Sequence, residues 1–409
     1  MWPPDGKPQN AGVIFLTALS HSCESRCETA VCCAVGKKLL KVSDNVASVV
    51  QARASHQGGQ ANHMVIACLG GERTVLEERP APVPGAGELL LRLRVVGFCG
   101  TDLFKLDSSA TEAGTVLGHE LVGEVIALGG GVTGFAEGDR VAVPHHVPCG
   151  TCHLCRCGNE TMCEMFRENL LEPGAFADTI LVKSRATEFA ARHLPDHVSD
   201  EAAVFMEPAA CVLRGVHRAG MDANDAAVVL GAGSMGLLHL LVLRAALPGC
   251  SVIVVDPVAE RRTLAEKLGA RNTVMPGNAA LEAVRAATGG LGADAVFDTV
   301  GGNEALKAAL GLTRQGGTVV LFAHAPDGGK AGFDLNDLFK YEQRIVGTYS
   351  GAVREQAEIF ELIGKGDLDP SPLVTHKMPL DDFEQGVALV RNHQALKVLF
   401  TPSRASSET

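Results

Sequence analysis

The chain has 409 residues, of which 46% are hydrophobic and 46 are glycine, and its formal net charge at pH 7 is −11. This length favours two domains over one compact core. The acidic charge and the low aromatic content of 4% argue against a nucleic-acid-binding protein, and no apolar run reaches the ~18 residues of a membrane span. Thirteen cysteines, several at metal-ligand spacing, favour a reducing, cytoplasmic compartment over secretion.

Residues 1–63 differ from the rest of the chain because they show no sustained hydrophobic period. They lack the basic start and long apolar run of a signal peptide, and they contain more acidic residues than a transit peptide. The four cysteines of this segment match no zinc-binding spacing: Cys23, Cys27, Cys32 and Cys33. We therefore expect a disordered or adventitious extension, and a functional protein that begins near the strand-like run MVIACL at Met64.

From residue 65 to about residue 143, short strand-like runs alternate with glycine and proline turns, which predicts a small, largely β domain. One run, LLLRLRVVGF, alternates apolar and basic residues with a period of two. Within this region Cys99, His119 and Glu120 supply a thiol, an imidazole and a carboxylate, the three side-chain types that bind zinc well. A zinc ion with three protein ligands and an open position polarises an alcohol or carbonyl oxygen.

A cysteine-rich segment follows, CGTCHLCRCGNETMC over residues 149–163. The spacing C-x2-C-x2-C-x7-C allows four thiolates to surround one tetrahedral ion and leave no open position, which predicts a structural zinc site. Its ligands would be Cys149, Cys152, Cys155 and Cys163. We interpret Cys157 as a spare thiol, and an iron–sulfur cluster is the less favoured occupant.

Glu207 precedes Pro208 and an apolar run of helical period, so we expect it at the start of a helix. An acid in that position complements the helix dipole, and this structural role is one interpretation of Glu207. The other is a side chain that faces a metal. Cys211, one turn further on, is expected in the core.

From about residue 225 the pattern becomes a buried strand, a glycine-rich turn and an apolar helix. The turn contains the G-x-G-x-x-G pattern of Gly231, Gly233 and Gly236. Such glycines allow a dinucleotide pyrophosphate to approach a helix N-terminus closely. Asp256 ends the next strand, where an acid accepts hydrogen bonds from the adenosine ribose and favours NAD. Arg261 and Arg262 are close enough in sequence to keep NADP as an alternative.

The segment around His119 reads Gly-His-Glu-x2-Gly-x5-Gly-x2-Val. It resembles the zinc signature of the medium-chain dehydrogenase/reductase family, the zinc-dependent alcohol and polyol dehydrogenases, and the resemblance extends over residues 64–402. It implies an α/β protein with a Rossmann doubly wound parallel sheet and a discontinuous, mainly β GroES-like catalytic domain. Strand-like runs that recur with helical spacers support that sheet. We expect the catalytic domain over 64–213, the NAD-binding domain over 214–348, and a return to the catalytic domain with a polar tail over 349–409.

The resemblance also implies roles for individual residues. Cys99 and His119 would bind the catalytic zinc, with Glu120 or Glu207 as third ligand; the Glu-Pro pair at 207 resembles the polyol-dehydrogenase branch. Thr101 matches the hydroxyl that relays the alcohol proton. Asp102 matches an acid that steadies the zinc-binding histidine.

One position departs from the family pattern. Many relatives carry a histidine five residues after the zinc cysteine, as the outer member of the proton relay, whereas this chain has Phe104. His145 and His146 lie where relatives line the substrate cleft. We expect one of them, with His146 preferred, to contact substrate or replace the relay; ordinary loop histidines are the alternative.

Together these residues predict a zinc-dependent oxidoreductase that transfers a hydride between NAD and a secondary alcohol, namely a polyol, a sugar-derived alcohol or an amino alcohol. One catalytic and one structural zinc are expected. The alternatives are an NADPH-dependent carbonyl reductase on the same fold and a non-catalytic nucleotide-binding member of the family. The family resemblance further implies a homo-oligomer whose other partner is a small-molecule alcohol, with no nucleic acid or membrane involved.

Overall fold

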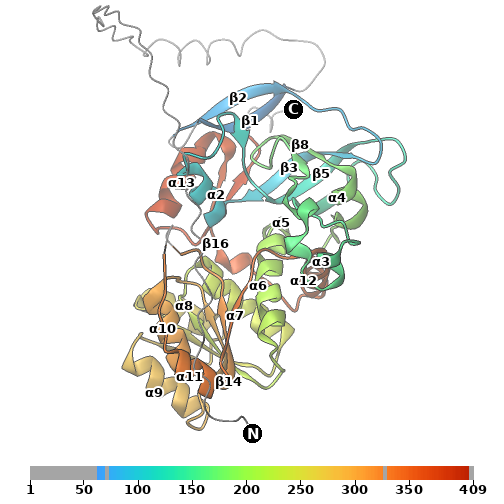
Figure 1. Ribbon diagram of the computed structural model, residues 1–409. Coiled ribbons are helices and arrows are strands. Elements are labelled where there is room, and N and C mark those ends of the chain that lie inside the picture. The colour runs from blue at the N-terminus through green and yellow to red at the C-terminus, as the bar shows by residue number, and fades with distance from the viewer. Residues whose placement is uncertain (1–61, 70–72, 326–328, 405–409) are drawn as a thin grey trace, which may run out of the picture. The chain divides into compact units, whose positions relative to one another are not determined.

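The computed structural model describes residues 62–69, 73–325 and 329–404, with the side chains of 62–69 and Arg73 left out (Figure 1). The predicted extension lies outside the described residues except for Asn62 and His63, which begin a strand. The last five residues of the predicted polar tail also lie outside them. The domain boundaries drawn from the sequence stay predictions.

The catalytic part is built on an eight-stranded sheet with the order β16-β17-β3-β5-β6-β9, to which β8 and β7 are added beside β3. Apart from the parallel pair β16 and β17, neighbouring strands are antiparallel. The strands are β3 (Leu89–Gly97), β5 (Glu120–Leu128), β6 (Arg140–Pro144), β7 (Leu171–Glu172), β8 (Thr179–Val182), β9 (Arg192–His193), β16 (Val374–Pro379) and β17 (Lys397–Thr401).

The central strand β3 departs from the alternation expected for LLLRLRVVGF. Of its nine residues only Arg92 is exposed, and seven are buried. Hydrophobic cores on both faces of the sheet cause this, because Val95 belongs to one buried cluster while Leu93 and Val96 belong to another. A smaller sheet with the order β2-β1-β4 lies in the same part of the chain. Its strands are β1 (Asn62–Leu69), β2 (Arg73–Pro80) and β4 (Thr115–Val116).

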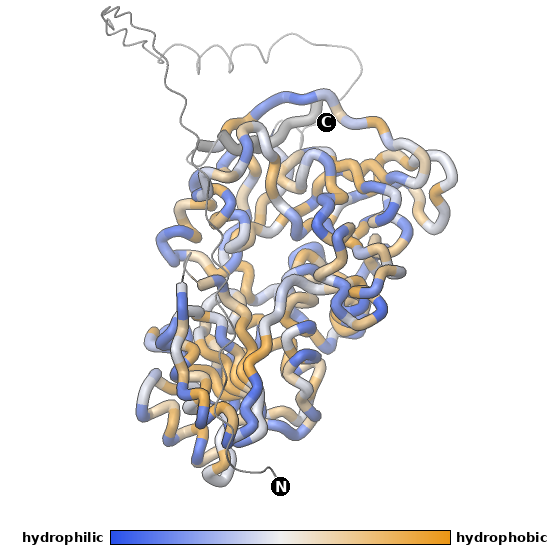
Figure 2. The backbone as a smooth tube through the Cα atoms, in the orientation of Figure 1, coloured by the Kyte–Doolittle hydropathy of each residue, from blue (hydrophilic) through white to orange (hydrophobic). Residues whose placement is uncertain are grey.

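The second sheet has six parallel strands in the order β12-β11-β10-β13-β14-β15. Numbered from its own first strand this is 3-2-1-4-5-6, the doubly wound order of dinucleotide-binding folds, so the predicted fold class is confirmed. The strands are β10 (Ala226–Leu230), β11 (Ser251–Val255), β12 (Asn272–Val274), β13 (Ala293–Asp298), β14 (Thr313–Leu321) and β15 (Arg344–Gly347). In Figure 2 the tube is largely orange, and therefore hydrophobic, in the part where these strands run. This is expected for a sheet covered on both faces.

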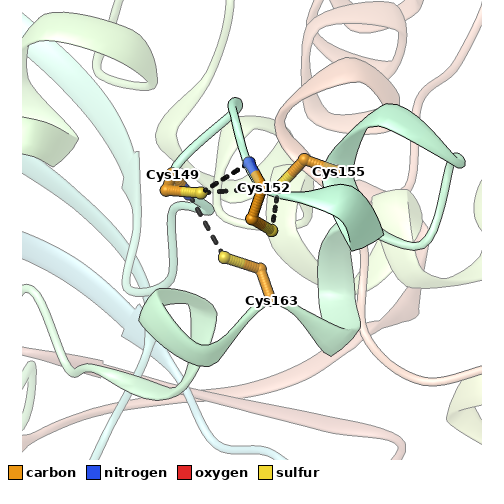
Figure 3. Close-up of side chains that lie close together, drawn as sticks. All are labelled: Cys149, Cys152, Cys155 and Cys163. Atoms are coloured by element: carbon orange, nitrogen blue, oxygen red, sulfur yellow. Dashed lines mark hydrogen bonds between the residues drawn. The ribbon is translucent and has the colours of Figure 1, made fainter.

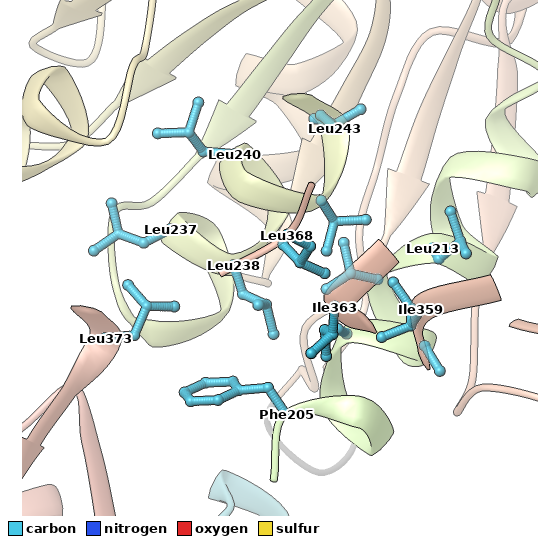
Figure 4. Packing of buried hydrophobic residues seen from close by; sticks show 14 of the residues in the cluster. Phe205, Leu213, Leu237, Leu238, Leu240, Leu243, Ile359, Ile363, Leu368 and Leu373 are labelled. Atoms are coloured by element: carbon cyan, nitrogen blue, oxygen red, sulfur yellow. The ribbon is translucent and has the colours of Figure 1, made fainter. Parts of the chain in front are cut away.

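Helices cover the two faces of this parallel sheet. On one face, α6, α7 and α12 pack into one large core. Figure 4 shows leucines of α7 facing Ile359 and Ile363 of α12. The opposite face packs against α9 and α10. Their bounds are α6 (Met206–Ala219), α7 (Ser234–Ala246), α8 (Ala259–Lys267), α9 (Asn278–Ala287), α10 (Asn303–Leu312) and α12 (Val353–Lys365).

The large core continues into the catalytic sheet, because Val95, Val122 and Ala142 pack in the same cluster as the residues of α6. Helix α6 therefore contacts both sheets and carries Glu207 between them. The remaining helices are α2 (Gly100–Leu106), α3 (His153–Arg156), α4 (Ser184–Phe189), α5 (Asp200–Ala203), α11 (Leu335–Lys340) and α13 (Phe383–Arg391), with 3-10 turns η2 (Glu160–Met162), η3 (Glu164–Arg167), η4 (Ser371–Leu373) and η5 (Leu380–Asp382). Within the described ranges, no helix combines the length and apolar character needed to cross a membrane.

Candidate active site

A group of metal-binding side chains lies at the end of β3 and the start of β5. Cys99 is the N-cap of α2, and His119 and Glu120 stand at the beginning of β5. One ligand atom from each of the three lies within 4.8 Å of the others. Gly97 pairs with Glu120 across the strands, and a Cβ at Gly97 would lie 2.2 Å from Glu120 Oε2. The donor set of sulfur, nitrogen and oxygen fits zinc.

Asp102 orients His119. Its Oδ1 lies 3.3 Å from His119 Nδ1, and its carboxylate also accepts hydrogen bonds from the amides of Cys99 at 3.0 Å and Gly118 at 3.2 Å. Burial by itself raises the pKa of Asp102, but His119 and the two amides outweigh it, so the pKa lies below its ordinary value. Asp102 contacts Nδ1 of His119 and so leaves Nε2 as the nitrogen available to a metal ion.

Lys397, which sequence reasoning missed, contacts Glu120. The two side chains form an ion pair in which both are at most 4% exposed. Lys397 Nζ also donates to the carbonyl of Phe98 at 3.3 Å and lies 5.5 Å from the ring centroid of Phe205. Burial lowers the pKa of Lys397, but the charge of Glu120 raises it further, so the group is an ammonium ion. Its one signal in the sequence is a lysine that opens the apolar run KVLF.

Glu207, the other predicted acid, lies beside this group without joining the three residues whose ligand atoms are within 4.8 Å. It occupies the first turn of α6 and is 7% exposed. Burial raises the pKa of Glu207, and the thiol of Cys211 donates to its Oε1 at 3.4 Å. The structure therefore places a buried acid, with a thiol as its hydrogen-bond partner, within electrostatic reach of His119 and Glu120.

Two histidines extend the site beyond His119. The ring centroids of His119 and His145 are 4.7 Å apart, and those of His145 and His146 are 3.6 Å apart. The Nδ1 atoms of His145 and His146 are buried without a hydrogen-bond partner. Burial lowers the pKa of His146 to about 4 and that of His145 well below its ordinary value. Both rings are neutral at pH 7, and their unpaired nitrogens are free to meet a polar ligand.

Thr101 lies in the first turn of α2, the helix that carries Phe104. Its amide donates to Cys99 Sγ at 3.4 Å, which fixes the sulfur at the helix start. Phe104, three residues later, is 52% exposed. Helical residues three apart are neighbours on the surface of a helix, so Thr101 and Phe104 share one side of α2.

The four predicted cysteines of the 149–163 segment converge, and their sulfurs point toward one another in Figure 3. The Sγ atom of Cys155 is 3.9 Å from that of Cys149 and 3.5 Å from that of Cys152. A tetrahedral ion with Zn–S bonds of ~2.3 Å separates its sulfurs by roughly 3.8 Å, so the cluster fits a structural zinc. Amide hydrogen bonds from Thr151 and Cys152 lower the pKa of Cys149 to about 6, which favours the thiolate that a metal requires.

The predicted glycine turn connects β10 to α7. Gly231 has φ +92°, and a Cβ at Gly236 would lie 1.9 Å from the carbonyl oxygen of Gly231, so the turn tolerates no side chain there. Asp256 follows β11 and accepts from the amides of Ala232 and Val258, each at 2.7 Å. Arg261 Nη1 lies 4.0 Å from its Oδ2.

A cavity of about 1240 Å³ joins the two predicted sites. The glycine turn, Asp256 and Arg261 line it on the side of the parallel sheet, and Cys99 and Lys397 line it on the side of the catalytic sheet. A dinucleotide bound at the turn would therefore extend toward the metal-binding group.

Comparisons with known proteins agree with this geometry. The model described as "Alcohol dehydrogenase GroES-like domain" matches residues 85–191, and "Zinc-binding dehydrogenase" matches residues 235–365. The chain is 29% identical over 337 residues to sorbitol dehydrogenase of Halalkalibacterium halodurans, covering 80% of this chain and 95% of that protein. It is 32% identical over 335 residues to L-threonine 3-dehydrogenase of Aeromonas hydrophila, covering 79% and 94%.

A solved structure from Sinorhizobium meliloti 1021, described as a zinc-binding dehydrogenase and bound to NADP, matches with a TM-score of 0.74 and 27% identity. The match covers 84% of this chain and all of that one. Zinc and a nicotinamide dinucleotide are therefore the cofactors that the fold, the matches and the side chains support. The chain belongs to the zinc-dependent medium-chain dehydrogenase/reductase family, and it is an oxidoreductase of the alcohol dehydrogenase type.

Proposed function

We propose that this enzyme oxidises a secondary alcohol and transfers its hydride to NAD, at a zinc ion held by Cys99, His119 and Glu120. The observation that carries the proposal is that these three ligand atoms lie within 4.8 Å of one another, and that one of the three residues, Cys99, lines the same cavity as the glycine turn. The related sorbitol and L-threonine dehydrogenases are named for a polyol and a hydroxy amino acid. A polyol, sugar-derived alcohol or amino alcohol is the corresponding substrate class here.

The residues divide the chemistry between them. When bound, zinc acidifies the alcohol as a Lewis acid and NAD accepts the hydride. Asp102 holds His119 in the tautomer that binds metal, at 3.3 Å. Thr101 passes on the proton that the alcohol loses, and His146 offers its unpaired Nδ1 to a second polar group of the substrate.

Glu120 is the third zinc ligand in this proposal, with Glu207 as the acid that exchanges with it. Lys397 supports this assignment because its buried ammonium group pairs with the carboxylate of Glu120 at the site. Burial raises the pKa of Glu207, and the thiol of Cys211 donates to it, so Glu207 is the second acid available beside the proposed zinc. A second zinc, bound by Cys149, Cys152, Cys155 and Cys163, is structural because four thiolates leave no open position.

The alternative is an NADPH-dependent carbonyl reductase. One observation favours it: Arg261 lines the cavity beside Asp256, where a 2′-phosphate would need a cation. Asp256 opposes it, because a buried carboxylate at that position repels phosphate.

We also propose that the protein self-associates along the edge of the parallel sheet. Strand β15 is the last strand in the sheet order. Nearby, Leu335 and Phe339 of α11 are 73% and 80% exposed, and Tyr341 is 41% exposed. An open strand edge beside exposed apolar side chains is suited to pairing with a second copy of the chain.

The test measures formation of reduced nicotinamide by the full chain, with NAD and NADP in parallel, against a panel of simple alcohols, polyols, sugars and amino alcohols. We expect turnover of secondary alcohols with NAD and two zinc ions per chain. Cys99→Ser should retain one zinc and lose turnover, whereas the matched control Cys157→Ser should keep both ions and full activity. Turnover by Cys99→Ser at the wild-type rate would overturn the proposal.

A further inference from the structure

An imidazole from the coenzyme-binding part of the chain stacks on Phe104, the residue that stands where many relatives carry a relay histidine. The ring centroids of Phe104 and His324 are 5.6 Å apart and their planes are inclined by 5°. His324 follows β14, at the carboxyl edge of the parallel sheet where doubly wound folds bind their ligands. The stack therefore joins α2 of the first part of the chain to the parallel sheet.

The backbone that carries His324 is held firmly. The amides of Phe322 and Ala323 both donate to the carbonyl of Asp298 at 3.1 Å. Gly301 has φ +81°, and a Cβ there would lie 2.7 Å from the carbonyl oxygen of His324. The backbone at Ala323 and the turn at Gly301 therefore hold His324 in place without a contribution from Phe104.

The reaction needs a group of this kind. Oxidation of an alcohol releases a proton, and the hydroxyl of Thr101 can pass a proton on but cannot hold it. Phe104 has no proton acceptor, and the Nδ1 atoms of His145 and His146 are buried without partners. His324 is exposed, and an imidazole exchanges protons with water near neutral pH.

We propose that His324 is the solvent-side proton acceptor of the relay that begins at Thr101, and that bound water connects the two side chains past the ring of Phe104. The inference rests on the proposed function. Side chains at positions i and i+3 of a helix are ~5–6 Å apart at Cβ, and the stacked rings of Phe104 and His324 are 5.6 Å apart. Each hydrogen bond of a water chain spans roughly 2.8 Å, so a few waters beside Phe104 can connect Thr101 to His324.

In the oxidation direction, the O–H bond of the alcohol breaks and its proton passes to the oxygen of Thr101. The proton of Thr101 passes through the water to a nitrogen of His324, which releases a proton to solvent. The electron pair of the C–H bond leaves as hydride and reduces NAD.

Among the described residues, the charged side chains of α2 are Asp102, which is buried, Lys105, which is exposed, and Asp107 at the helix end, which pairs with Arg391. In the turn beside His324, Asp298 uses its Oδ1 to accept from the amides of Val300 and Gly301.

The test replaces the imidazole with a ring that still stacks. Wild-type kcat for alcohol oxidation should fall at acidic pH along one ionisation. His324→Phe should lower kcat at neutral pH by roughly 10²-fold, remove that ionisation and leave KM for the coenzyme within about twofold. His324→Ala should regain turnover when free imidazole is added. His376→Phe, which removes a half-buried histidine of β16, is the matched control and should keep the wild-type profile.

A second readout needs no turnover. NMR titration of the His324 imidazole, assigned by its absence in His324→Phe, should give the same pKa as the kinetic ionisation. A wild-type pH profile in His324→Phe, or no rescue of His324→Ala by imidazole, would overturn the inference and leave the proposed function standing. A zinc-loaded wild type that oxidises no alcohol would defeat both.

Discussion

Lys397, the first residue of β17, forms a buried ion pair with Glu120, the first residue of β5. The pair lies close to Cys99, because Lys397 Nζ also donates to the carbonyl of Phe98, the residue before Cys99. Because β17 and β5 both pair with β3, the C-terminal strand supplies a charge to a site whose other members come from the first part of the catalytic domain.

Replacing Lys397 should be strongly destabilising. Lys397→Met leaves the carboxylate of Glu120 buried without a cation, and breaking a buried pair by removing one partner lowers the free energy of unfolding by about 3–5 kcal/mol. Urea unfolding at fixed zinc concentration measures the loss. The control is Lys377→Met, which removes a cation 48% exposed from its pair with Glu201 and should cost about 0–1 kcal/mol. Equal, small losses in the two variants would contradict the buried-pair account.

Two glycines of the coenzyme turn should respond differently to alanine. In Gly236→Ala the new Cβ meets the carbonyl of Gly231 at 1.9 Å, so the strand–helix packing must open, with a loss of about 1–3 kcal/mol in unfolding free energy. In Gly233→Ala the Cβ has no neighbour within 4 Å, so stability should stay unchanged. Coenzyme affinity should still fall, because this glycine lets the backbone approach the pyrophosphate. Thermal unfolding and coenzyme titration separate the two effects; equal thermal stability of the variants would count against the close approach.

Arg214 of α6 should hold the cysteine-rich segment in place. Its guanidinium, 4% exposed, donates to the carbonyl of Gly158 at 3.0 Å and lies 3.3 Å from Glu160 and 3.5 Å from Glu355. Arg214→Met should therefore speed zinc release from the four cysteines to a chromophoric chelator and lower the free energy of unfolding by about 3 kcal/mol. Arg218→Met, an exposed position on the same helix, should release zinc at the wild-type rate. Unchanged release from Arg214→Met would show that the segment needs no such support.

His239 should make the fold sensitive to acid. It is 0% exposed, and burial lowers its pKa from 6.5 to about 4, while a contact with the Met235 carbonyl raises it only in part. The unfolded chain therefore binds the proton more readily, so stability is complete above about pH 6.5 and falls as the pH drops toward 4, by about 3 kcal/mol in total. His239→Phe, which keeps a ring beside Phe297 and Phe322, should flatten this part of the profile. Parallel profiles for variant and wild type in urea unfolding would exclude His239 as the cause.

Short contiguous patterns were sufficient for much of the fold and site. The spacing of the four cysteines predicted a cluster that the structure brings together, because a few residues of intervening chain leave little freedom in where the sulfurs lie. The glycine turn could also be predicted, because the positive φ at Gly231 and the close contact at Gly236 both arise within six residues. The alternation of strand-like and helical segments predicted a doubly wound parallel sheet, and the structure supplied its strand order.

The burial of individual residues within those elements was harder to predict from the sequence. The run LLLRLRVVGF predicted a half-exposed strand, and β3 is instead buried on both faces. The cause lies outside the run, in the two cores that cover the sheet. A strand's own pattern reports exposure only when one face meets solvent.

The sequence by itself determined the family, the doubly wound order and the candidate ligands, because those depend on local geometry and on residue types at short spacing. Only the tertiary structure decided that Lys397 faces Glu120, that Arg214 reaches Gly158, and that His324 stacks on Phe104. Each of these contacts joins segments far apart in the chain. Their formation depends on how two sheets and the helices between them pack, and no pattern within any one segment encodes that packing.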